Sequence, residues 1–306
     1  MNRPNVLVAY HANCIDGFTS AWILNRFFNR KAIKVDCIPV NYTEKSYQSI
    51  EKVIKELYIT DVYIVDFSIP TQLITHITNI ISGELWILDH HRTAFEKYFQ
   101  KDNYVEGQRK TITSSACKII LDDSESGASL VWKHIMNCIE VPNLIRYVRE
   151  YDLHKFTDEK RARAVNMYLR SLNKTFEDWD KVYTNLEYYE GEEYIINYGN
   201  YLLDIFEKNC QDIAKNCYPI SFNNISGLAV ETHPEYSTRV GNILAEKSGT
   251  FGATVYHSDD TVQWSFRSTP ETGVNVAAIA KTLGGGGHTR AAGAIIKKDK
   301  GNETIN

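Results

Sequence analysis

The sequence has few cysteines, and none of them is clustered. Its 306 residues include six cysteines, and no two form a C-x-x-C pair. A zinc ribbon needs closely spaced cysteine pairs, and a disulfide framework needs a dense cysteine pattern, so neither is indicated. We therefore expect reduced thiols and a cytoplasmic protein.

Long hydrophobic runs and an excess of basic charge are also missing. No charge-free stretch is long enough to span a bilayer, and the short apolar run near the N-terminus is not a signal peptide, so we expect no membrane segment. The sequence has 34 Lys and Arg residues and 38 Asp and Glu residues, which gives a net charge of −4. Without a global basic field, coating of long nucleic acid is disfavoured, although a local groove can still be basic.

The first half of the chain alternates between two hydrophobic patterns. Short apolar runs at residues 5–10, 34–40, 61–67 and 84–91 are separated by amphipathic segments. Strands that are apolar on both faces and alternate with helices predict an α/β domain, in which helices cover both faces of a parallel sheet. A mainly helical part is expected from residue 126 onward.

A long helix and a smaller domain complete the predicted organisation. Residues 191–217 are expected to form one amphipathic helix that ends before Pro219. We predict an N-terminal α/β domain at residues 1–190, this linker helix, and a smaller α+β domain at 218–306. Tyrosines around the linker helix are expected to pack in the core or at a domain interface; they are Tyr183, Tyr188, Tyr189, Tyr194, Tyr198 and Tyr201.

Acidic and imidazole side chains follow three of the predicted strands. His11, Asp66 and the acid–histidine–histidine run at 89–91 fall at or just past the strand ends, where parallel sheets bind ligands. A lone aspartate there usually caps a helix or forms a turn, but three such strand ends are hard to explain as independent caps. Mixed Asp and His ligation suits Mn²⁺ or Mg²⁺, and the histidines favour Mn²⁺.

Four consecutive glycines, residues 284–287, precede His288 in the second domain. They form either a flexible linker or a loop that lets the backbone approach a ligand. Because strand character resumes at residue 291, we favour a loop whose N–H groups cradle phosphate or sugar oxygens. Arginines nearby add donors suited to phosphate. The predicted substrate-binding residues are Arg267, Gly285, Gly286, Gly287, His288 and Arg290.

Taken together, these motifs resemble the DHH phosphoesterase family. The resemblance is carried by H-x4-D-G-F at 11–18, VDFS at 65–68, LDHH at 88–91, ESGASLVW at 125–132 and REYDLHKF at 149–156. SFRS at 265–268 and NVAAIAKTLGGGGHTRAAG at 275–293 closely resemble the DHH-associated substrate-binding domain. The motifs span nearly the whole chain in the family's order.

The resemblance implies a centre of two metal ions. Carried over residue by residue, Asp66 is the carboxylate that bridges the two ions, and His11 binds one of them. The other ion takes Asp16, His90 and Asp152 as its ligands. Such a centre hydrolyses phosphate esters by in-line attack.

The resemblance also implies three catalytic residues beside the metals. Asp89 orients its neighbouring histidine, while His91 and Arg92 face the phosphoryl oxygens and stabilise their growing charge. The family's second domain closes over the metal site, which implies a substrate between Asp89 and Gly286.

One position departs from the family's pattern. The first motif usually has two acids separated by one residue, and if Asp16 is the second of them, Cys14 replaces the first. The first metal position is then weaker, empty, or filled through a thiolate that a bound cation stabilises. A buried inert cysteine is the alternative, so one metal or two is left open.

The expected activity is metal-dependent hydrolysis of phosphodiester or phosphomonoester bonds in short nucleotides, such as dinucleotides or the substrates of an oligoribonuclease. The missing basic field favours small substrates over long strands.

One alternative is a nucleotide-binding or sequestering protein whose catalysis is weakened at Cys14. Another is a single-strand-specific exonuclease with a basic channel. A pyrophosphatase fits the glycine run poorly. Self-association is left open.

Overall fold

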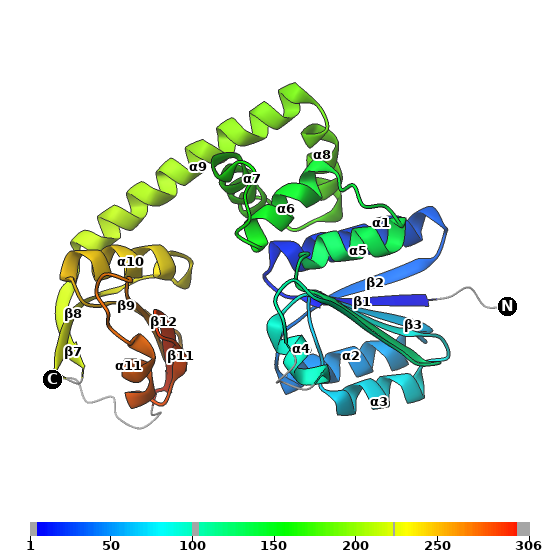
Figure 1. Ribbon diagram of the computed structural model, residues 1–306, viewed down its shortest axis with the longest axis horizontal. Coiled ribbons are helices and arrows are strands. Elements are labelled where there is room, and N and C mark those ends of the chain that lie inside the picture. The colour runs from blue at the N-terminus through cyan, green and yellow to red at the C-terminus, as the bar shows by residue number, and fades with distance from the viewer. Residues whose placement is uncertain (1–4, 100–103, 223, 299–306) are drawn as a thin grey trace. The chain divides into compact units, whose positions relative to one another are not determined.

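The computed structural model of the protein describes residues 5–99, 104–222 and 224–298. The chain divides into two compact units, residues 1–202 and 203–306. Each unit contains its own six-stranded sheet (Figure 1). Among the helices of the described ranges, none is both long enough and apolar enough to cross a membrane.

The sheet of the first unit is parallel except at one edge. Its strand order is β2-β1-β3-β4-β6-β5, and of these described strands only β5 runs antiparallel to its neighbour. This arrangement confirms the predicted α/β class and adds two strands, β5 and β6, that the sequence analysis did not predict. The strands are β1 (Asn5–His11), β2 (Lys34–Val40), β3 (Asp61–Val65), β4 (Leu85–Asp89), β5 (Arg109–Thr113) and β6 (Cys117–Asp122).

Helices cover both faces of this sheet, as predicted (Figure 1). On one face, α2 (Glu44–Glu56) and α3 (Thr71–Ile80) bury their apolar sides against the strands in one continuous core. The other face carries α1 (Ile15–Arg30) and α5 (Gly127–Met136). The remaining helices of the unit are α4 (Arg92–Tyr98), α6 (Asn143–Asp152), α7 (Glu159–Ser171) and α8 (Phe176–Leu186).

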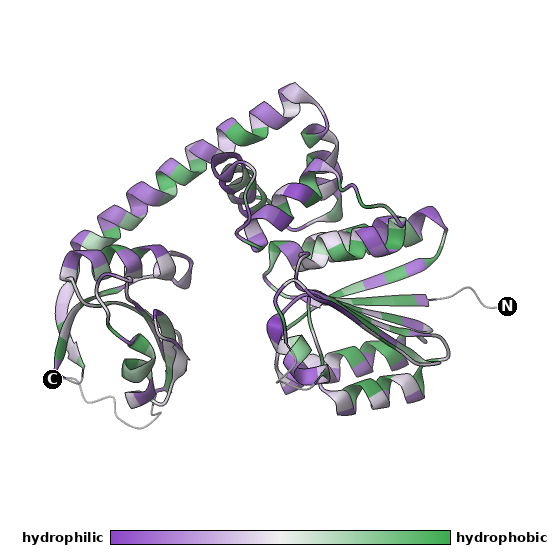
Figure 2. Cartoon of the chain, viewed as in Figure 1, coloured by the Kyte–Doolittle hydropathy of each residue, from purple (hydrophilic) through white to green (hydrophobic). Residues whose placement is uncertain are grey.

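A single helix, α9 (Tyr189–Lys215), contributes to both units and starts and ends two residues earlier than the sequence predicts. Figure 2 shows polar and apolar residues alternating along it. Its first half packs through Ile195, Ile196 and Gly199, where an added Cβ would lie 2.0 Å from the Ala164 carbonyl oxygen of α7. Five of the tyrosines that were expected in the core or at a domain interface are not in the core of the described chain, while packing at a domain interface stays a prediction. The exposed residues are Tyr188, Tyr189, Tyr194, Tyr198 and Tyr201.

The second unit is an α+β structure with strand order β11-β12-β10-β9-β8-β7. Among its described strands, β8 and β9 pair in parallel and the other pairs are antiparallel. The glycine run is not a free loop throughout, because its second half pairs with β12 as a short strand. The elements are β7 (Tyr218–Phe222), β8 (Ile225–Glu231), a 3-10 turn (Pro234–Tyr236), α10 (Ser237–Ser248), β9 (Gly252–His257), β10 (Thr261–Arg267), α11 (Val276–Thr282), β11 (Gly286–His288) and β12 (Ala291–Lys297).

Candidate metal centre and substrate pockets

Three neighbouring strands deliver polar side chains to the same edge of the first sheet. His11 ends β1, Asp66 directly follows β3, and Asp89 ends β4. The Asp66 amide donates a hydrogen bond to the Leu88 carbonyl oxygen at 3.0 Å, which keeps the ends of β3 and β4 in register. The strand order reverses between β1 and β3, because β2 and β3 flank β1 on opposite sides. Ligands of such sheets usually bind beyond the carboxyl ends of the strands at this position.

The backbone around Asp66 is strained and closely packed. Asp66 has a φ of 55°, in the left-handed region that few residues other than glycine adopt. An added Cβ at Gly17 would lie 2.5 Å from the His11 carbonyl oxygen and 3.1 Å from Asp66 Oδ2. One at Gly127 would lie 2.6 Å from the Asp66 Cβ. The first turns of α1 and α5 can therefore approach Asp66 only because both carry glycine.

The five predicted metal ligands come together around Asp66. Within each of two groups, the potential ligand atoms lie within 4.8 Å of one another. The first group is His11, Cys14 and Asp66, and the second is Asp16, His90 and Asp152. Asp66 also reaches the second group, because its Oδ1 lies 3.0 Å from His90 Nε2.

The first group contains two buried polar atoms without a partner. His11 Nδ1 and Asp66 Oδ2 lie 3.7 Å apart, too far for a hydrogen bond, and neither has another hydrogen-bond partner among the described residues. Leaving such atoms unpaired is costly in a folded protein. A cation bound by both atoms would satisfy them, so the residues present fit a metal ion.

The second group is held by the start of α5. Both oxygens of Asp16 accept backbone hydrogen bonds, from Gly127 at 2.5 Å and Ala128 at 3.0 Å. His90 Nε2 lies 3.8 Å from Asp16 Oδ2 and 3.5 Å from Asp152 Oδ2. The helix N-terminus stabilises the buried carboxylate and fixes its direction toward the imidazole.

The buried carboxyl and imidazole groups of this centre shift one another's pKa values. Burial, and then the charge of Asp66, raise the pKa of Asp16, and burial is also the main cause that raises the pKa of Asp152. Burial opposes ionisation of Asp66 too, but the adjacent His11 and His90 hold its pKa below the usual range. Burial alone would lower the pKa of His90, and the nearby carboxylates raise it to about 10. A divalent cation would relieve this repulsion between buried acids.

Asp89 orients His91, while Arg92 pairs with a residue of its own helix. Asp89 Oδ1 accepts hydrogen bonds from the backbone amides of His90 and His91 and lies 2.7 Å from His91 Nδ1. With Nδ1 engaged, His91 Nε2 makes no hydrogen bond to any described residue and can meet a ligand. By contrast, the Arg92 side chain is exposed and pairs with Glu96 on its own helix, at 3.1 Å.

Lys97 is a cationic side chain near the centre that the sequence analysis missed. Its Nζ donates to the carbonyl and hydroxyl oxygens of Ser68, at 3.1 and 3.2 Å. Burial lowers its pKa, and the negative charge of Asp89 partly opposes that shift. The sequence signal was weak, because Lys97 lies on α4 and nothing in its neighbours marks it as different from a solvated lysine.

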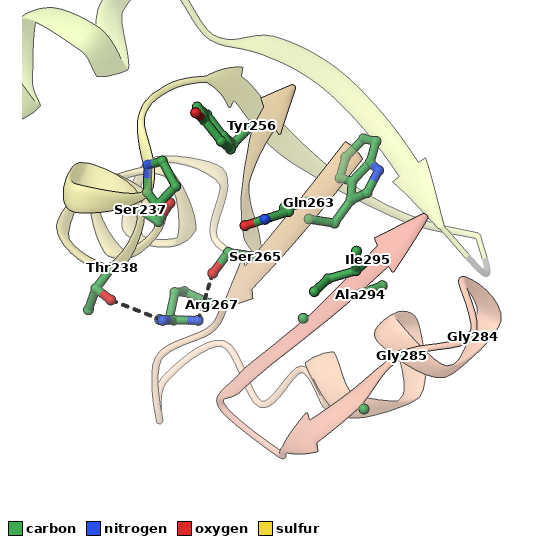
Figure 3. Close-up of a pocket in the computed structure, with 14 residues that line it drawn as sticks. Ser237, Thr238, Tyr256, Gln263, Ser265, Arg267, Gly284, Gly285, Ala294 and Ile295 are labelled. Carbon is green, nitrogen blue, oxygen red and sulfur yellow. Dashed lines mark hydrogen bonds between the residues drawn. The ribbon is translucent and has the colours of Figure 1, made fainter. Parts of the chain in front are cut away.

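The six predicted substrate-binding residues lie in two separate pockets of the second unit. Arg267, Gly285 and Gly286 line one pocket of about 700 Å³, where the Arg267 guanidinium donates to Thr238 Oγ1 at 3.0 Å and Ser265 Oγ at 3.1 Å (Figure 3). The second pocket, of about 650 Å³, is lined by Gly287, His288 and Arg290, together with Asn275, Ala277 and Thr289.

Comparison with known proteins gives a family match for the second unit. Residues 226–306 match the DHHA1 domain model. An uncharacterized protein of Acanthamoeba polyphaga mimivirus is 25% identical over 317 residues, which cover 98% of this chain and 70% of that protein.

Two solved structures are similar to the chain. RecJ from Thermus thermophilus in complex with Mn²⁺ has 14% identity and a TM-score of 0.47; the match covers 95% of this chain and 49% of RecJ. The chain thus spans about half the length of that protein. An exopolyphosphatase-related protein from Bacteroides fragilis has 15% identity and a TM-score of 0.48, with 98% of this chain and 88% of that protein covered.

The matched domain contains the glycine run and both pockets' glycines, and the Asp-His-His sequence that names the family begins at the last residue of β4 in the first unit. Residues 226–306 therefore form a DHHA1 domain at the C-terminal end of the chain.

Proposed function

We propose that the protein is a metal-dependent phosphoesterase that hydrolyses phosphodiester or phosphomonoester bonds of short nucleotides. The observation that carries this proposal is the meeting of two ligand groups at Asp66 in a chain with a DHHA1 domain. Asp16, His90 and Asp152 would hold one divalent cation, with Mn²⁺ or Mg²⁺ suited to these ligands. His11 would hold a second cation together with Asp66. When bound, such cations polarise phosphoryl oxygens as Lewis acids.

His91 is the proposed proton donor to the phosphoryl group. Its Nδ1 is held by Asp89, so the free Nε2 is the atom that would face a substrate. Burial lowers the pKa of His91, but Asp89 more than reverses this and favours the protonated ring. An Nε2–H group would then donate to a phosphoryl oxygen or protonate the leaving oxygen. Lys97 is a further candidate for stabilising charge on the phosphate.

The DHHA1 pockets are proposed to bind the nucleotide. The Arg267 pocket combines a guanidinium with Tyr256, Gln263 and Trp264, a mixture that suits a phosphate and a base. In the other pocket, His288 and Arg290 would bind phosphate oxygens. The net charge of −4 favours substrates with few phosphates. A cytoplasmic location stays a prediction.

The test is product analysis with metal-free protein reloaded with Mn²⁺. The substrates would be a linear dinucleotide, a cyclic dinucleotide, a five-residue RNA, a long single strand, a 3′,5′-bisphosphate and pyrophosphate. We expect mononucleotides to appear fastest from the shortest linear substrates. Asp66→Asn should lower turnover by roughly three orders of magnitude or more without unfolding the protein, because it removes the carboxylate that belongs to the first group and contacts His90 of the second. Near-normal turnover would contradict the assignment of Asp66.

A nucleotide-sequestering protein is the second candidate, and Cys14 is the observation that favours it. If the first ligand group, which contains Cys14, does not support catalysis, nucleotides should bind tightly while no product forms at saturating Mn²⁺. Calorimetric binding alongside product analysis separates this outcome from hydrolysis. Orthophosphate released from pyrophosphate would instead indicate a pyrophosphatase.

A further inference from the structure

The two ligand groups differ in one atom type. The first offers nitrogen, sulfur and oxygen from His11, Cys14 and Asp66, whereas the second, at Asp16, His90 and Asp152, offers only nitrogen and oxygen. This difference bears on metal selection, because thiolate favours softer cations, while carboxylate favours Mg²⁺ and Mn²⁺.

Local structure does not account for a cysteine at position 14. Cys14 is the N-cap residue of α1, a position usually filled by a residue whose side-chain oxygen accepts a helix N–H hydrogen bond. The Cys14 side chain makes no such capping bond. Its thiol is not in a disulfide and is only partly buried, so neither capping nor cross-linking explains the residue.

Buried unpaired atoms beside Cys14 indicate a ligand. Asp66 is 1% exposed, and its Oδ2 has no hydrogen-bond partner within the described part of the chain. The same is true of His11 Nδ1, which lies 3.7 Å away. Both residues belong to the group that contains Cys14, and the 3.7 Å between His11 Nδ1 and Asp66 Oδ2 is short enough for both atoms to contact one cation.

We propose that His11, Cys14 and Asp66 form a mixed nitrogen–sulfur–oxygen site that selects Zn²⁺ over Mn²⁺ and Mg²⁺. The second group keeps a preference for the harder cations, so the centre holds two different metals. This inference rests on the proposed metal-dependent function and specifies which cation each position takes. A bound cation deprotonates a coordinating thiol, so Cys14 supplies one negative charge, as an aspartate would, with a softer donor atom.

Cobalt is the probe for the sulfur ligand, since Co²⁺ occupies zinc sites and gives a thiolate-to-metal charge-transfer band in the near ultraviolet. Metal-free full-length protein would be titrated with Co²⁺ and its absorption recorded. We expect the band in the unmodified protein and its loss in Cys14→Ser. Cys138→Ser is the matched control, because Cys138 is an exposed cysteine outside both groups, and it should keep the band. The same band in Cys14→Ser would overturn the proposal.

Metal content after competitive loading gives a second readout. The protein would be loaded from equimolar Zn²⁺ and Mn²⁺, and the retained ions measured by mass spectrometry. We expect Cys14→Asp, which restores an acid, to lower the preference for Zn²⁺ over Mn²⁺ by about tenfold or more at one position. An unchanged ratio would contradict the inference, and circular dichroism would confirm that both variants fold.

The binding experiments separate this inference from the proposed activity. A cysteine-dependent cobalt band in a protein that hydrolyses no phosphate ester would support the metal site and reject the phosphoesterase. Hydrolysis with a band that survives Cys14→Ser would support the phosphoesterase and reject the site.

Discussion

The missing side chain of Gly127 allows α5 to begin against Asp66. A Cβ there would lie 2.6 Å from the Asp66 Cβ and 2.8 Å from Asp16 Oδ2, closer than real Cβ atoms approach such neighbours. Both contacts are with acids of the candidate centre, so the substitution would displace ligands of both groups. The cost arises at buried atoms that have no space to move.

We expect Gly127→Ala to weaken metal binding by about tenfold or more and to destabilise the protein by about 1–3 kcal/mol, as overpacking commonly does. Isothermal titration with Mn²⁺ and thermal unfolding would measure the two effects. The control is Gly286→Ala, because an added Cβ at Gly286 meets no atom within 4 Å. Equal metal affinity in Gly127→Ala and the unmodified protein would show that α5 does not position the ligands.

The positions of some site residues could be predicted from the sequence, and those of others could not. His11, Asp66 and Asp89 were predictable as neighbours because parallel strand ends share one edge. The role of Arg92 beside the phosphate stays a prediction, since its exposed side chain pairs with Glu96 and its place beside a phosphate is set by no strand end. Lys97 was missed because it contacts Ser68, which lies 29 residues earlier in the sequence. A local sequence pattern does not predict a contact between residues so far apart in the chain.

At the scale of elements, an ion pair joins the C-terminal half of α9 to α10. The Arg239 guanidinium donates two hydrogen bonds to the Glu207 carboxylate, both at 2.7 Å. The hydrogen bonds to Arg239 lower the pKa of Glu207 to about 2, although burial opposes this shift. Because the pKa in the folded protein lies below the ordinary value of 4.5, the charged pair stabilises the fold fully above that pH.

The stabilisation by Glu207 should disappear as the pH falls from about 4.5 toward 2. We expect Glu207→Gln to lower the free energy of unfolding by only ~0.2–1 kcal/mol at pH 7, since both side chains are about 40% exposed. Thermal unfolding of the two proteins from pH 7 to pH 3 would measure the difference. Asp212→Asn, which removes an exposed pair with Lys215 on the same helix, should change less. A difference that grows at low pH would contradict the assignment.

Most strands with a strong hydrophobic pattern were predicted, although the buried strand β6 was missed. The apolar runs predicted β1, β3 and β4 because buried parallel strands have few alternatives. The pattern did not predict β5, whose sequence RKTIT is mostly exposed at the sheet edge. It also did not predict β11, since the sequence GGH has no strand preference and pairs with β12 only through backbone contact in the folded chain.

At the scale of the whole molecule, the net charge favours substrates with few phosphates. The chain carries 34 basic and 38 acidic residues, and many of its arginines already pair with acids, as Arg146, Arg149 and Arg161 do. Each phosphate of a bound single strand that is neutralised by the protein releases counterions, which makes the affinity depend on salt. A protein built for short nucleotides should therefore show a weak salt dependence.

We expect the logarithm of the association constant for a linear dinucleotide to fall with the logarithm of salt concentration with a slope of about −1 to −2, because about two phosphate contacts contribute about −0.7 each. Fluorescence anisotropy with the inactive Asp66→Asn protein would measure this slope between low and physiological salt. A long single strand should give nearly the same slope if only its end is bound. A slope steeper than about −4 for the long strand requires about six phosphate contacts, which would favour the exonuclease with a basic channel over the enzyme for short nucleotides.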